Sequence, residues 1–352
     1  MMEKGHRTTA YLLPLIAMQE QFILRSRKLG LKARIWDSTM DSQDAPDILL
    51  VVMETSSSDG FRLHLEQLVQ ANRLARVIID EAHLILAHCH FRPVMNTLTW
   101  VGALGVPAIV QSATIPPSIL PHLFAKVGVT HYTICREPTP RPNVAFKVQT
   151  VDDVDSHIAR IWAARNVAPL TTLFFCSSED VVKRLAKSLR IEPCYAALGN
   201  DANSALLSRL RNGSIRGIIT TPVLGVALDV PDVSLVVHRG CPFNMLGYIQ
   251  ESGRSGRNPD GFATSLVLLE RNFSPHKVQE PDYAGTRLMD DHIRNDTHCR
   301  HWMITLFNDG VGMTCTMMPW ISNLCDVCER QVDSLVPVEY SSDMILPYLL
   351  GQ

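Results

Sequence analysis

The stretch ARVIIDEAHLIL, residues 75–86, places two carboxylates and a histidine directly after an apolar run. We interpret the run as a buried strand, with Asp80, Glu81 and His83 just beyond its carboxyl end. An Asp in this position can hold Mg²⁺, and the adjacent Glu can polarise an attacking water, as in nucleotide hydrolases. The alternative is an acidic helix N-terminus, at which carboxylates only favour the helix dipole. Taken alone, the stretch leaves both interpretations open.

The sequence around this stretch alternates short apolar runs with amphipathic segments. The apolar runs predict strands within residues 10–18, 33–37, 46–54, 76–80 and 106–114. Between them, residues 19–30 predict a helix closed by Gly30, and residues 60–75 place their apolar positions on one helical face. Continuous apolar strands separated by helices are typical of a parallel sheet covered on both faces. The first third of the chain therefore predicts an α/β lobe.

The proline-rich stretch REPTPRPNV, residues 136–144, is the best candidate for a domain boundary, as a stiff extended spacer. After it the alternation restarts, with strands predicted at 171–178, 216–221 and 233–240 and a helix at 179–190. The fold class expected is therefore α/β, with two parallel-sheet lobes in tandem. We place a first lobe at 1–137, a second at 138–272, a cysteine-rich subdomain at 273–335 and a tail at 336–352.

The stretch YIQESGRSGR, residues 248–257, supplies Gln250, Arg254 and Arg257 in the second lobe. Its two arginines lie three residues apart, and its glycines let the backbone approach a ligand closely. Arginines from a facing domain can stabilise negative charge on a transferring phosphoryl group. The simpler interpretation is a glycine-bearing turn with solvated arginines. Its pairing with DEAH some 170 residues earlier favours the catalytic interpretation.

Four of the nine cysteines crowd into residues 299–328, and the other five are scattered in apolar surroundings. Cys325 and Cys328 form a C-x-x-C pair that can chelate one tetrahedral ion, and Cys299 with Cys315 can complete a structural Zn²⁺ site. His298 or His301 could replace one of these ligands, and buried thiols without a metal are the alternative. This distribution suits a reducing compartment better than a disulfide framework.

The charge balance neither demands nor excludes a nucleic-acid partner. Lys and Arg total 33 against 35 for Asp and Glu, so binding to DNA has to come from local patches. One basic cluster, within residues 24–34, includes Arg25, Arg27 and Lys28, which could contact phosphates or could simply form a solvated helix face. No apolar stretch reaches the length of a membrane span, so we expect a soluble protein without a membrane partner.

The motifs occur in a recognisable order: YLLPLIAMQEQ, DEAH, QSAT, TTLFFCSS, TTPVLGVALDVPDVSLVVH and QESGRSGR. This series resembles that of superfamily 2 helicases. The FRP after DEAH, the VVH to QESGRSGR run and the cysteine cluster ending in CDVC resemble the RecQ-type DNA helicases in particular. The resemblance covers most of residues 11–330. It implies two RecA-like lobes, a zinc subdomain and ATP-dependent 3′ to 5′ unwinding of single-stranded or forked DNA, with ATP, Mg²⁺ and Zn²⁺ as cofactors. It also implies an intracellular protein, nuclear in a eukaryote and otherwise cytoplasmic.

The resemblance also implies roles for individual residues. It assigns Asp80 to Mg²⁺ coordination and Glu81 to water activation, with Gln250 among the catalytic residues and Arg254 and Arg257 as arginine fingers. His83, Ser112 and Thr114 would couple hydrolysis to DNA movement. The family's second motif implies a DNA contact for the segment that contains Pro14. The DNA backbone and the lobe interface would be met by Thr220, Thr221 and Asp229.

Two features depart from the family pattern. The glycine-rich P-loop belongs upstream of YLLPLIAMQEQ, yet nowhere in the sequence does a Gly precede a Lys. Without that backbone cradle the β and γ phosphates lose their main anchor, and the first lobe should lack a core strand and leave apolar surface uncovered. We therefore expect a truncated helicase with impaired ATPase or, alternatively, a catalytically inactive nucleic-acid-binding or interaction module. In addition, Phe91 is the only aromatic residue in the loop after DEAH, where the family has an aromatic-rich loop that senses DNA.

Overall fold

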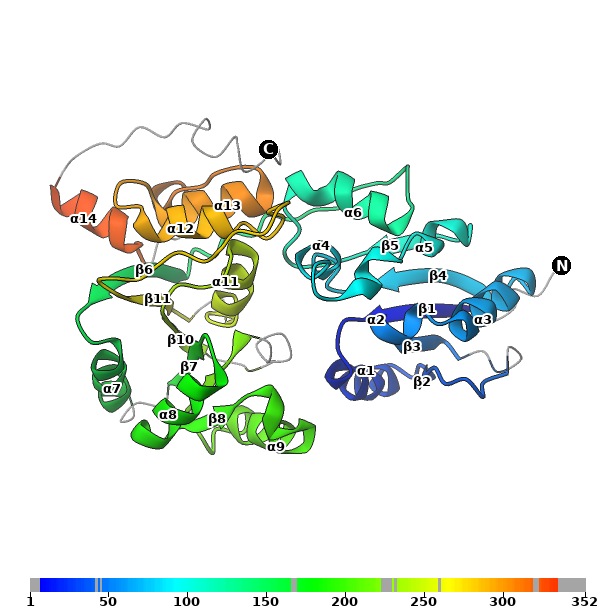
Figure 1. Cartoon of the computed structure of the whole chain (residues 1–352), viewed down its shortest axis with the longest axis horizontal. Coiled ribbons are helices and arrows are strands. Elements are labelled where there is room, and N and C mark those ends of the chain that lie inside the picture. Colours follow the sequence, from blue (N-terminus) through cyan, green and yellow to red (C-terminus); the bar gives the residue numbers. More distant parts are fainter. Residues whose placement is uncertain are drawn as a thin grey trace. The chain divides into compact units, whose positions relative to one another are not determined.

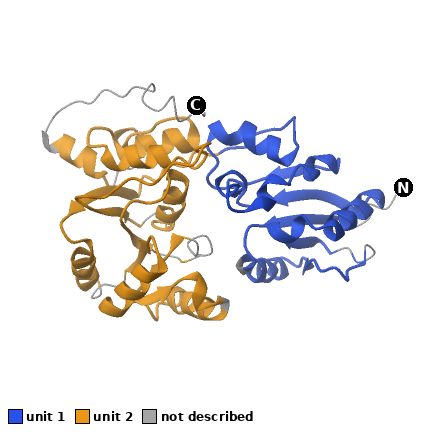
Figure 2. Ribbon diagram, viewed as in Figure 1, with its two compact units in different colours: residues 1–136 blue, residues 137–352 orange. Residues whose placement is uncertain are grey.

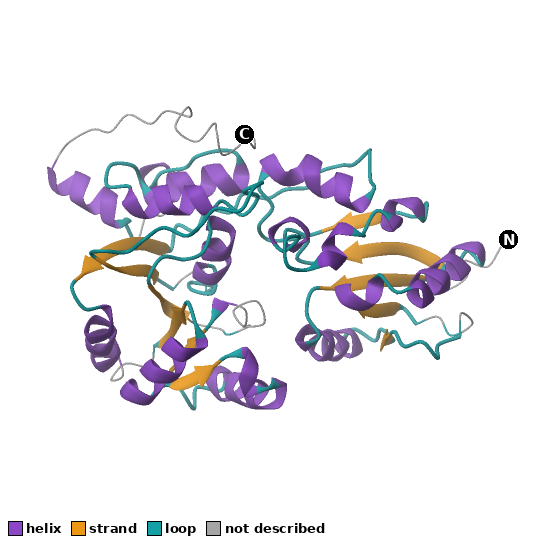
Figure 3. Ribbon diagram, in the orientation of Figure 1, coloured by secondary structure: helices purple, strands orange, loops and turns teal. Residues whose placement is uncertain are grey.

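The computed structural model describes residues 7–41, 44, 46–165, 170–222, 230, 233–258, 261–318 and 323–334. The chain divides into two compact units, Met1–Arg136 and Glu137–Gln352 (Figure 2). In each unit, helices flank a sheet of parallel strands (Figure 3). The tail at 336–352 lies outside the described residues.

The first unit is built on a five-stranded sheet in the order β2-β3-β1-β4-β5 (Figure 1). All of its strand pairs are parallel. Because β1 and β4 lie side by side near the centre, the residues that follow them meet at one edge of the sheet. The strands are β1 (Thr8–Leu13), β2 (Ala33–Ile35), β3 (Ile48–Val52), β4 (Leu74–Ile79) and β5 (Ala108–Val110). The helices are α1 (Ala17–Lys28), α2 (Met53–Ser56), α3 (Asp59–Gln70), α4 (Leu84–Ala87), α5 (Trp100–Ala103) and α6 (Leu120–Val127).

Local sequence explains where these helices begin and end. The hydroxyl of Ser58 caps α3 by accepting a hydrogen bond from the backbone N–H of Phe61. Gly30 follows the end of α1 with a φ of 74°, a left-handed conformation that glycine adopts without strain. Both boundaries follow from residue types that the sequence analysis could recognise.

Strand β5 is an edge strand among the described residues, with β4 as its neighbour. It is only three residues long, and Ile109 at its centre is 38% exposed. In a parallel sheet that is covered on both faces, such an apolar side chain would be buried. An apolar side chain is therefore partly exposed at this edge of the described sheet, and the expected absence of a core strand stays a prediction.

The second unit contains a six-stranded parallel sheet in the order β6-β11-β10-β7-β9-β8. Apolar side chains from both faces form its core, with helix α8 packed close to β7, β8 and β9. The strands are β6 (Val144–Val151), β7 (Thr171–Cys176), β8 (Glu192–Cys194), β9 (Gly217–Thr220), β10 (Val233–Arg239) and β11 (Ala263–Glu270). The helices that accompany the sheet are α7 (Val154–Arg165), α8 (Glu179–Leu189), α9 (Asn200–Arg211) and α11 (Met245–Ser252).

Three further helices follow β11 and complete the second unit: α12 (Thr286–Arg294), α13 (Arg300–Asp309) and α14 (Asp326–Ser334). Helices α13 and α14 contact β6, so the cysteine-rich region packs against the edge of the second sheet (Figure 1). The predicted fold class is confirmed, because both lobes are parallel-sheet α/β structures and the cysteine cluster follows them. No helix in the described ranges is both long enough and apolar enough to cross a membrane.

Candidate nucleotide and metal sites

The acidic pair follows strand β4 directly, as the sequence predicted. Asp80 is half-buried, and its Oδ1 accepts hydrogen bonds from the backbone N–H of Glu81, at 2.9 Å, and from Gln111 Nε2, at 3.2 Å. Gln111 Nε2 also lies 2.5 Å from the hydroxyl of Tyr11 on β1. Burial and the neighbouring Asp80 carboxylate raise the pKa of Tyr11, so its hydroxyl stays protonated. Sequence reasoning missed Tyr11 and Gln111, although Gln111 opens the QSAT motif.

Ser112 joins the acidic pair to the histidine of the same motif. Its hydroxyl lies 2.7 Å from His83 Nδ1 and 3.2 Å from Glu81 Oε2, and it accepts the backbone N–H of Thr114 at 3.1 Å. Burial, with a smaller contribution from His88, lowers the pKa of His83 to about 3, so the ring is neutral at physiological pH. The structure thus brings together the predicted residues Glu81, His83, Ser112 and Thr114.

The helix-cap interpretation of the acidic pair does not account for this geometry. Helix α4 begins at Leu84, and His83 occupies its N-cap position without a side-chain capping bond. Glu81 has a φ of 47°, in the left-handed region that a non-glycine residue rarely adopts. The two carboxylates therefore lie outside the helix, on a strained turn at the sheet edge.

The predicted DNA-binding residues of the first unit fall into two groups. Arg25, Arg27 and Lys28 are exposed in the last turn of α1, where basic side chains also favour the helix dipole. Pro14 is buried instead, and its carbonyl accepts a 3.0 Å hydrogen bond from Arg92, which also forms an ion pair with Glu54. Arg92 belongs to the FRP signal, yet sequence reasoning gave it no role of its own.

In the second unit, the arginine-bearing segment forms the turn after helix α11. Gln250 is half-buried on the last turn of the helix, Arg254 is half-buried beyond it, and Arg257 is exposed. The helix is tied to β10 by a buried pair, because His238 Nε2 lies 2.8 Å from Glu251 Oε2. The sequence predicted the turn but not this pair.

The remaining second-lobe predictions lie on or after strand β9. Thr220 and Thr221 are both buried, and the hydroxyl of Thr220 donates to the carbonyl of Thr221 at 3.1 Å. Asp229 lies outside the described residues. Any contact of Thr220 and Thr221 with a DNA backbone stays a prediction.

The four predicted cysteines converge in the second unit. The sulfurs of Cys299, Cys315, Cys325 and Cys328 all lie within 4.8 Å of one another, and all four residues are buried. Four backbone N–H groups point at these sulfurs from 3.2 to 3.4 Å, an arrangement that favours thiolates. Hydrogen bonding between the sulfurs of Cys299 and Cys315, which lie 3.5 Å apart, lowers the pKa of Cys299. The donor set and its compactness fit a tetrahedral ion such as Zn²⁺.

The histidines considered as substitute ligands lie beside the cluster. His301 Nδ1 is 3.2 Å from Cys315 Sγ, and its Nε2 is 3.2 Å from the carbonyl oxygen of Arg141. Burial disfavours the charged ring, yet the sulfurs of Cys299 and Cys325 raise the pKa of His301 to about 9. His298 Nδ1 lies 2.8 Å from the hydroxyl of Thr297. In the described residues, the group arranged to hold a metal is the four cysteines.

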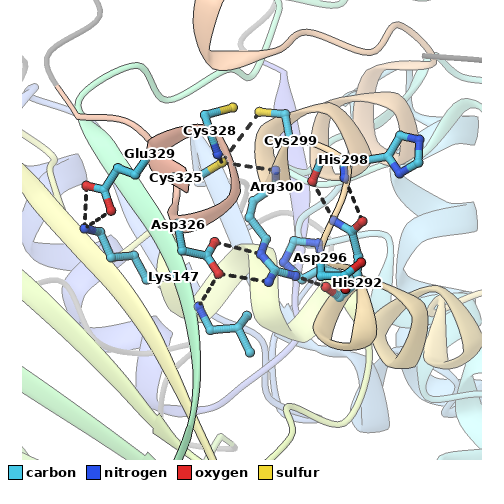
Figure 4. A network of polar contacts seen from close by, with 12 residues as sticks. Lys147, His292, Asp296, His298, Cys299, Arg300, Cys325, Asp326, Cys328 and Glu329 are labelled. Atoms are coloured by element: carbon cyan, nitrogen blue, oxygen red, sulfur yellow. Dashed lines mark hydrogen bonds and ion pairs between the residues drawn. The ribbon is translucent and has the colours of Figure 1, made fainter. Parts of the chain in front are cut away.

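A buried ion pair attaches the cysteine cluster to strand β6. Arg300 donates from Nε and a terminal nitrogen to the two carboxylate oxygens of Asp326, at 2.9 and 3.0 Å, and both side chains are almost fully buried (Figure 4). Asp326 also accepts the backbone N–H of Val148 on β6 at 3.4 Å. Nearby, Lys147 pairs with Glu329 in a more exposed position. The docking of this region therefore depends on charge as well as on apolar packing.

Comparison with known proteins relates this chain to helicases. Residues 156–259, within the second lobe, match the family model of the helicase conserved C-terminal domain. Two solved structures are similar in fold. One is Saccharomyces cerevisiae Dbp5 bound to RNA and ADP BeF3, with a TM-score of 0.62, 13% identity, and cover of 99% of this chain and 82% of that one. The other is Mycobacterium smegmatis helicase Lhr bound to ssDNA and AMP-PNP, with a TM-score of 0.57, 16% identity, and cover of 83% and 42%.

The chain is also similar to curated DNA helicases. The chain is 26% identical over 358 residues to the putative ATP-dependent DNA helicase Q1 of Caenorhabditis briggsae, covering 93% of this chain and 57% of that protein. It is 24% identical over 331 residues to the ATP-dependent DNA helicase RecQ of Bacillus subtilis, covering 86% and 55%. The chain thus spans a little over half the length of these relatives. Together with the motif order, these similarities support a superfamily 2 helicase of RecQ type.

Proposed function

We propose that this chain acts in ATP-dependent 3′ to 5′ unwinding of DNA, as part of a RecQ-type helicase. The observation that carries the proposal is the contact of one hydroxyl, that of Ser112, with both Glu81 and His83 beside Asp80. A shared hydroxyl lets a change around the acidic pair move the segment that follows β5. Such a connection is what coupling of hydrolysis to DNA movement requires.

The residues of the acidic site divide the chemistry between them. Asp80 keeps a half-buried carboxylate at the sheet edge, where it can hold Mg²⁺, whose charge would stabilise the phosphate oxygens of bound ATP. Glu81 stands next to it to orient water, and neutral His83 can exchange hydrogen bonds with Ser112 without carrying charge. Arg254 and Arg257 would add positive charge to the phosphates from the second lobe.

The given sequence contains no Gly-Lys pair, so these 352 residues hold no P-loop lysine to anchor the phosphates. For the 352-residue chain we therefore expect little or no DNA-stimulated ATP hydrolysis. We expect hydrolysis when the chain is extended by upstream coding sequence that supplies a strand followed by G-K-[ST].

The test measures ATP hydrolysis with and without single-stranded DNA for the chain and for its extended form. Glu81→Gln should abolish turnover of the extended form, whereas Glu66→Gln, at an exposed position on α3, is the matched control. Unwinding of forked DNA with a 3′ or a 5′ loading strand then tests polarity. An extended form that carries the P-loop yet hydrolyses no ATP would contradict the proposal.

DNA binding by the chain itself provides a separate measurement. Replacing Arg25, Arg27 and Lys28 with Ala should weaken the binding of single-stranded DNA. The slope of log K against log salt concentration should decrease in magnitude by about 2, because each of three phosphate contacts contributes ~0.7. The matched control replaces Lys183, Arg184 and Lys187, of which Lys183 and Arg184 already pair with Glu179 and Asp155. Equal effects of the two triple variants would show that the cluster on α1 is not a specific contact.

A catalytically inactive binding or interaction module is the second candidate, favoured by the absence of a Gly-Lys pair from the sequence. It predicts DNA binding by the chain, no ATPase, and no upstream in-frame G-K-[ST] in the coding DNA. The upstream sequence therefore discriminates between the two functions. In either case we propose Zn²⁺ at the cysteine cluster, and action on DNA in the nucleus if the source is eukaryotic and in the cytoplasm otherwise.

A further inference from the structure

Residues 139–143, here called the strap, connect the cysteine-rich region to the arginine turn within the second unit. At one end, the backbone N–H and hydroxyl of Thr139 donate to the carboxylate of Asp309, the last residue of α13, over 2.9 to 3.0 Å. Pro140 and Pro142 restrict the backbone of the strap. The proline-rich stretch is therefore anchored to α13 rather than serving only as a spacer.

Arg141 holds the arginine turn by its backbone. Its guanidinium is half-buried and donates to the carbonyl oxygens of Gly253, Ser255 and Gly256, at 3.4, 2.7 and 2.7 Å. These carbonyls lie on both sides of Arg254 and immediately before Arg257. Because one rigid, planar fork fixes all three, the position of Arg141 sets the direction in which the two arginines leave the turn.

A second strap residue strengthens the same contact. The side-chain amide of Asn143 donates to the carbonyl of Gly256 at 2.8 Å. Gly256 has a φ of 59°, and a Cβ there would come within 2.9 Å of the Asn143 amide nitrogen. The turn therefore fits the strap closely enough that displacement of either one displaces the other.

His301 connects the other end of the path to the cysteine cluster. Its Nε2 donates to the carbonyl of Arg141, which also accepts the backbone N–H of Val144 at the start of β6. Its Nδ1 contacts Cys315 Sγ, the residue is 2% exposed, and its ring is nearly perpendicular to that of Phe146, with the ring centroids 4.8 Å apart. A buried ring with both nitrogens engaged transmits a shift of Cys315 to the strap.

We propose that Arg141 is a positioning residue that couples metal occupancy of the four-cysteine site, through His301, to the order of the turn carrying Arg254 and Arg257. An ion bound to the cysteines fixes Cys315, and Cys315 fixes His301 and the strap. Loss of the ion loosens these contacts one after another, from Cys315 to His301 and the strap. The metal therefore orders the turn that carries Arg254 and Arg257 as well as the cysteine-rich region.

Amide hydrogen exchange of the intact chain tests this coupling without depending on ATPase. In the zinc-loaded protein, Arg141→Lys and His301→Phe should each speed exchange in residues 252–257 by roughly tenfold, the loss expected when one buried hydrogen bond or its support is removed. Exchange in β7 should not change, and zinc content should stay at one ion per chain. The control is His298→Phe, whose ring bonds Thr297 instead.

Chelation of the metal provides the second arm. In the wild type, removing zinc should speed exchange in residues 252–257, and in Arg141→Lys it should add little, because the path is already interrupted. Unchanged exchange of the turn in zinc-loaded His301→Phe overturns the proposal, whatever chelation does to the rest of the unit. Full additivity of chelation and Arg141→Lys overturns it as well. Neither result would affect the proposed helicase function.

Discussion

The buried pair between Arg300 and Asp326 offers a quantitative test of how the cysteine-rich region is held. Asp326→Asn removes the charge that faces the Arg300 guanidinium across two bonds of 2.9 and 3.0 Å. The Arg300 side chain is only 3% exposed, so its charge would stay buried without its counterion. Breaking such a pair from one side costs about 3 to 5 kcal/mol. We expect that loss in the unfolding free energy of the second unit.

The assay is urea denaturation of zinc-saturated protein, with Glu329→Gln as the matched control. Glu329 also links α14 to β6, through Lys147 at 2.7 Å, but their side chains are 46% and 28% exposed. Solvent screens that pair, so its loss should cost at most about 1 kcal/mol. Replacing both members of the buried pair with apolar residues, Arg300→Met with Asp326→Leu, should recover much of the loss. A cost for Asp326→Asn no larger than that for Glu329→Gln would refute the reasoning.

Three further predictions follow from local features. Burial lowers the pKa of His83 from 6.5 to about 3 in the folded chain, so the unfolded state binds more protons below about pH 6.5. The unfolding free energy of the first unit should therefore fall by up to roughly 1.4 kcal/mol per pH unit as the pH decreases through this range. His83→Gln should flatten that part of the profile of urea midpoint against pH. Gly256→Ala should cost about 2 kcal/mol or more, because its φ is positive and its Cβ would press on Asn143, whereas Gly213→Ala, with a φ of 75° and open space around it, should cost about 1 kcal/mol. Thermal unfolding of both glycine variants measures the difference, and equal losses would contradict it. Cys325→Ser should abolish stoichiometric zinc binding, which release of the metal to a chromophoric chelator measures. The second unit should also be strongly destabilised, since structural zinc contributes on the order of 10 kcal/mol. Retention of one zinc per chain would show that this sulfur is not a ligand.

Much of the fold could be predicted because its signals are local. Apolar runs such as residues 77–79 and 173–176 are short and rich in β-branched or aromatic residues, and amphipathic segments separate them. This pattern is typical of parallel strands covered by helices. The C-x-x-C spacing likewise indicated that the Cys325 and Cys328 sulfurs can share one ion, whereas the sequence left open whether His298 or His301 replaces another cysteine. The predicted α/β fold class therefore agrees with the structure, although the strand predicted within residues 10–18 ends at Leu13 and helix α1 begins at Ala17.

Predictions that depended on side-chain surroundings were less complete. Pro14 is buried, and its carbonyl oxygen accepts a hydrogen bond from Arg92. The hydroxyl of Thr220 donates to the carbonyl oxygen of Thr221. Neither arrangement is visible in a motif, because a motif gives the residue type and not its exposure. The pair of His238 and Glu251 was missed for the same reason, since its members lie on a strand and a helix that pack only in the folded unit.

The sequence by itself determined the class of the protein: the order of strands and helices, the acidic pair at a strand end, the paired arginines after a helix and the four cysteines. These depend on periodicity and spacing, which the chain carries without folding. Only the tertiary structure decided which groups act together. Parallel pairing of β1, β4 and β5 brings Tyr11, Asp80 and Gln111 to one sheet edge. Packing of α13 against β6 places His301 between Cys315 and Arg141. Hydrogen bonds between such distant segments have no local signature, because their energy depends on burial and geometry that exist only after the sheet has formed.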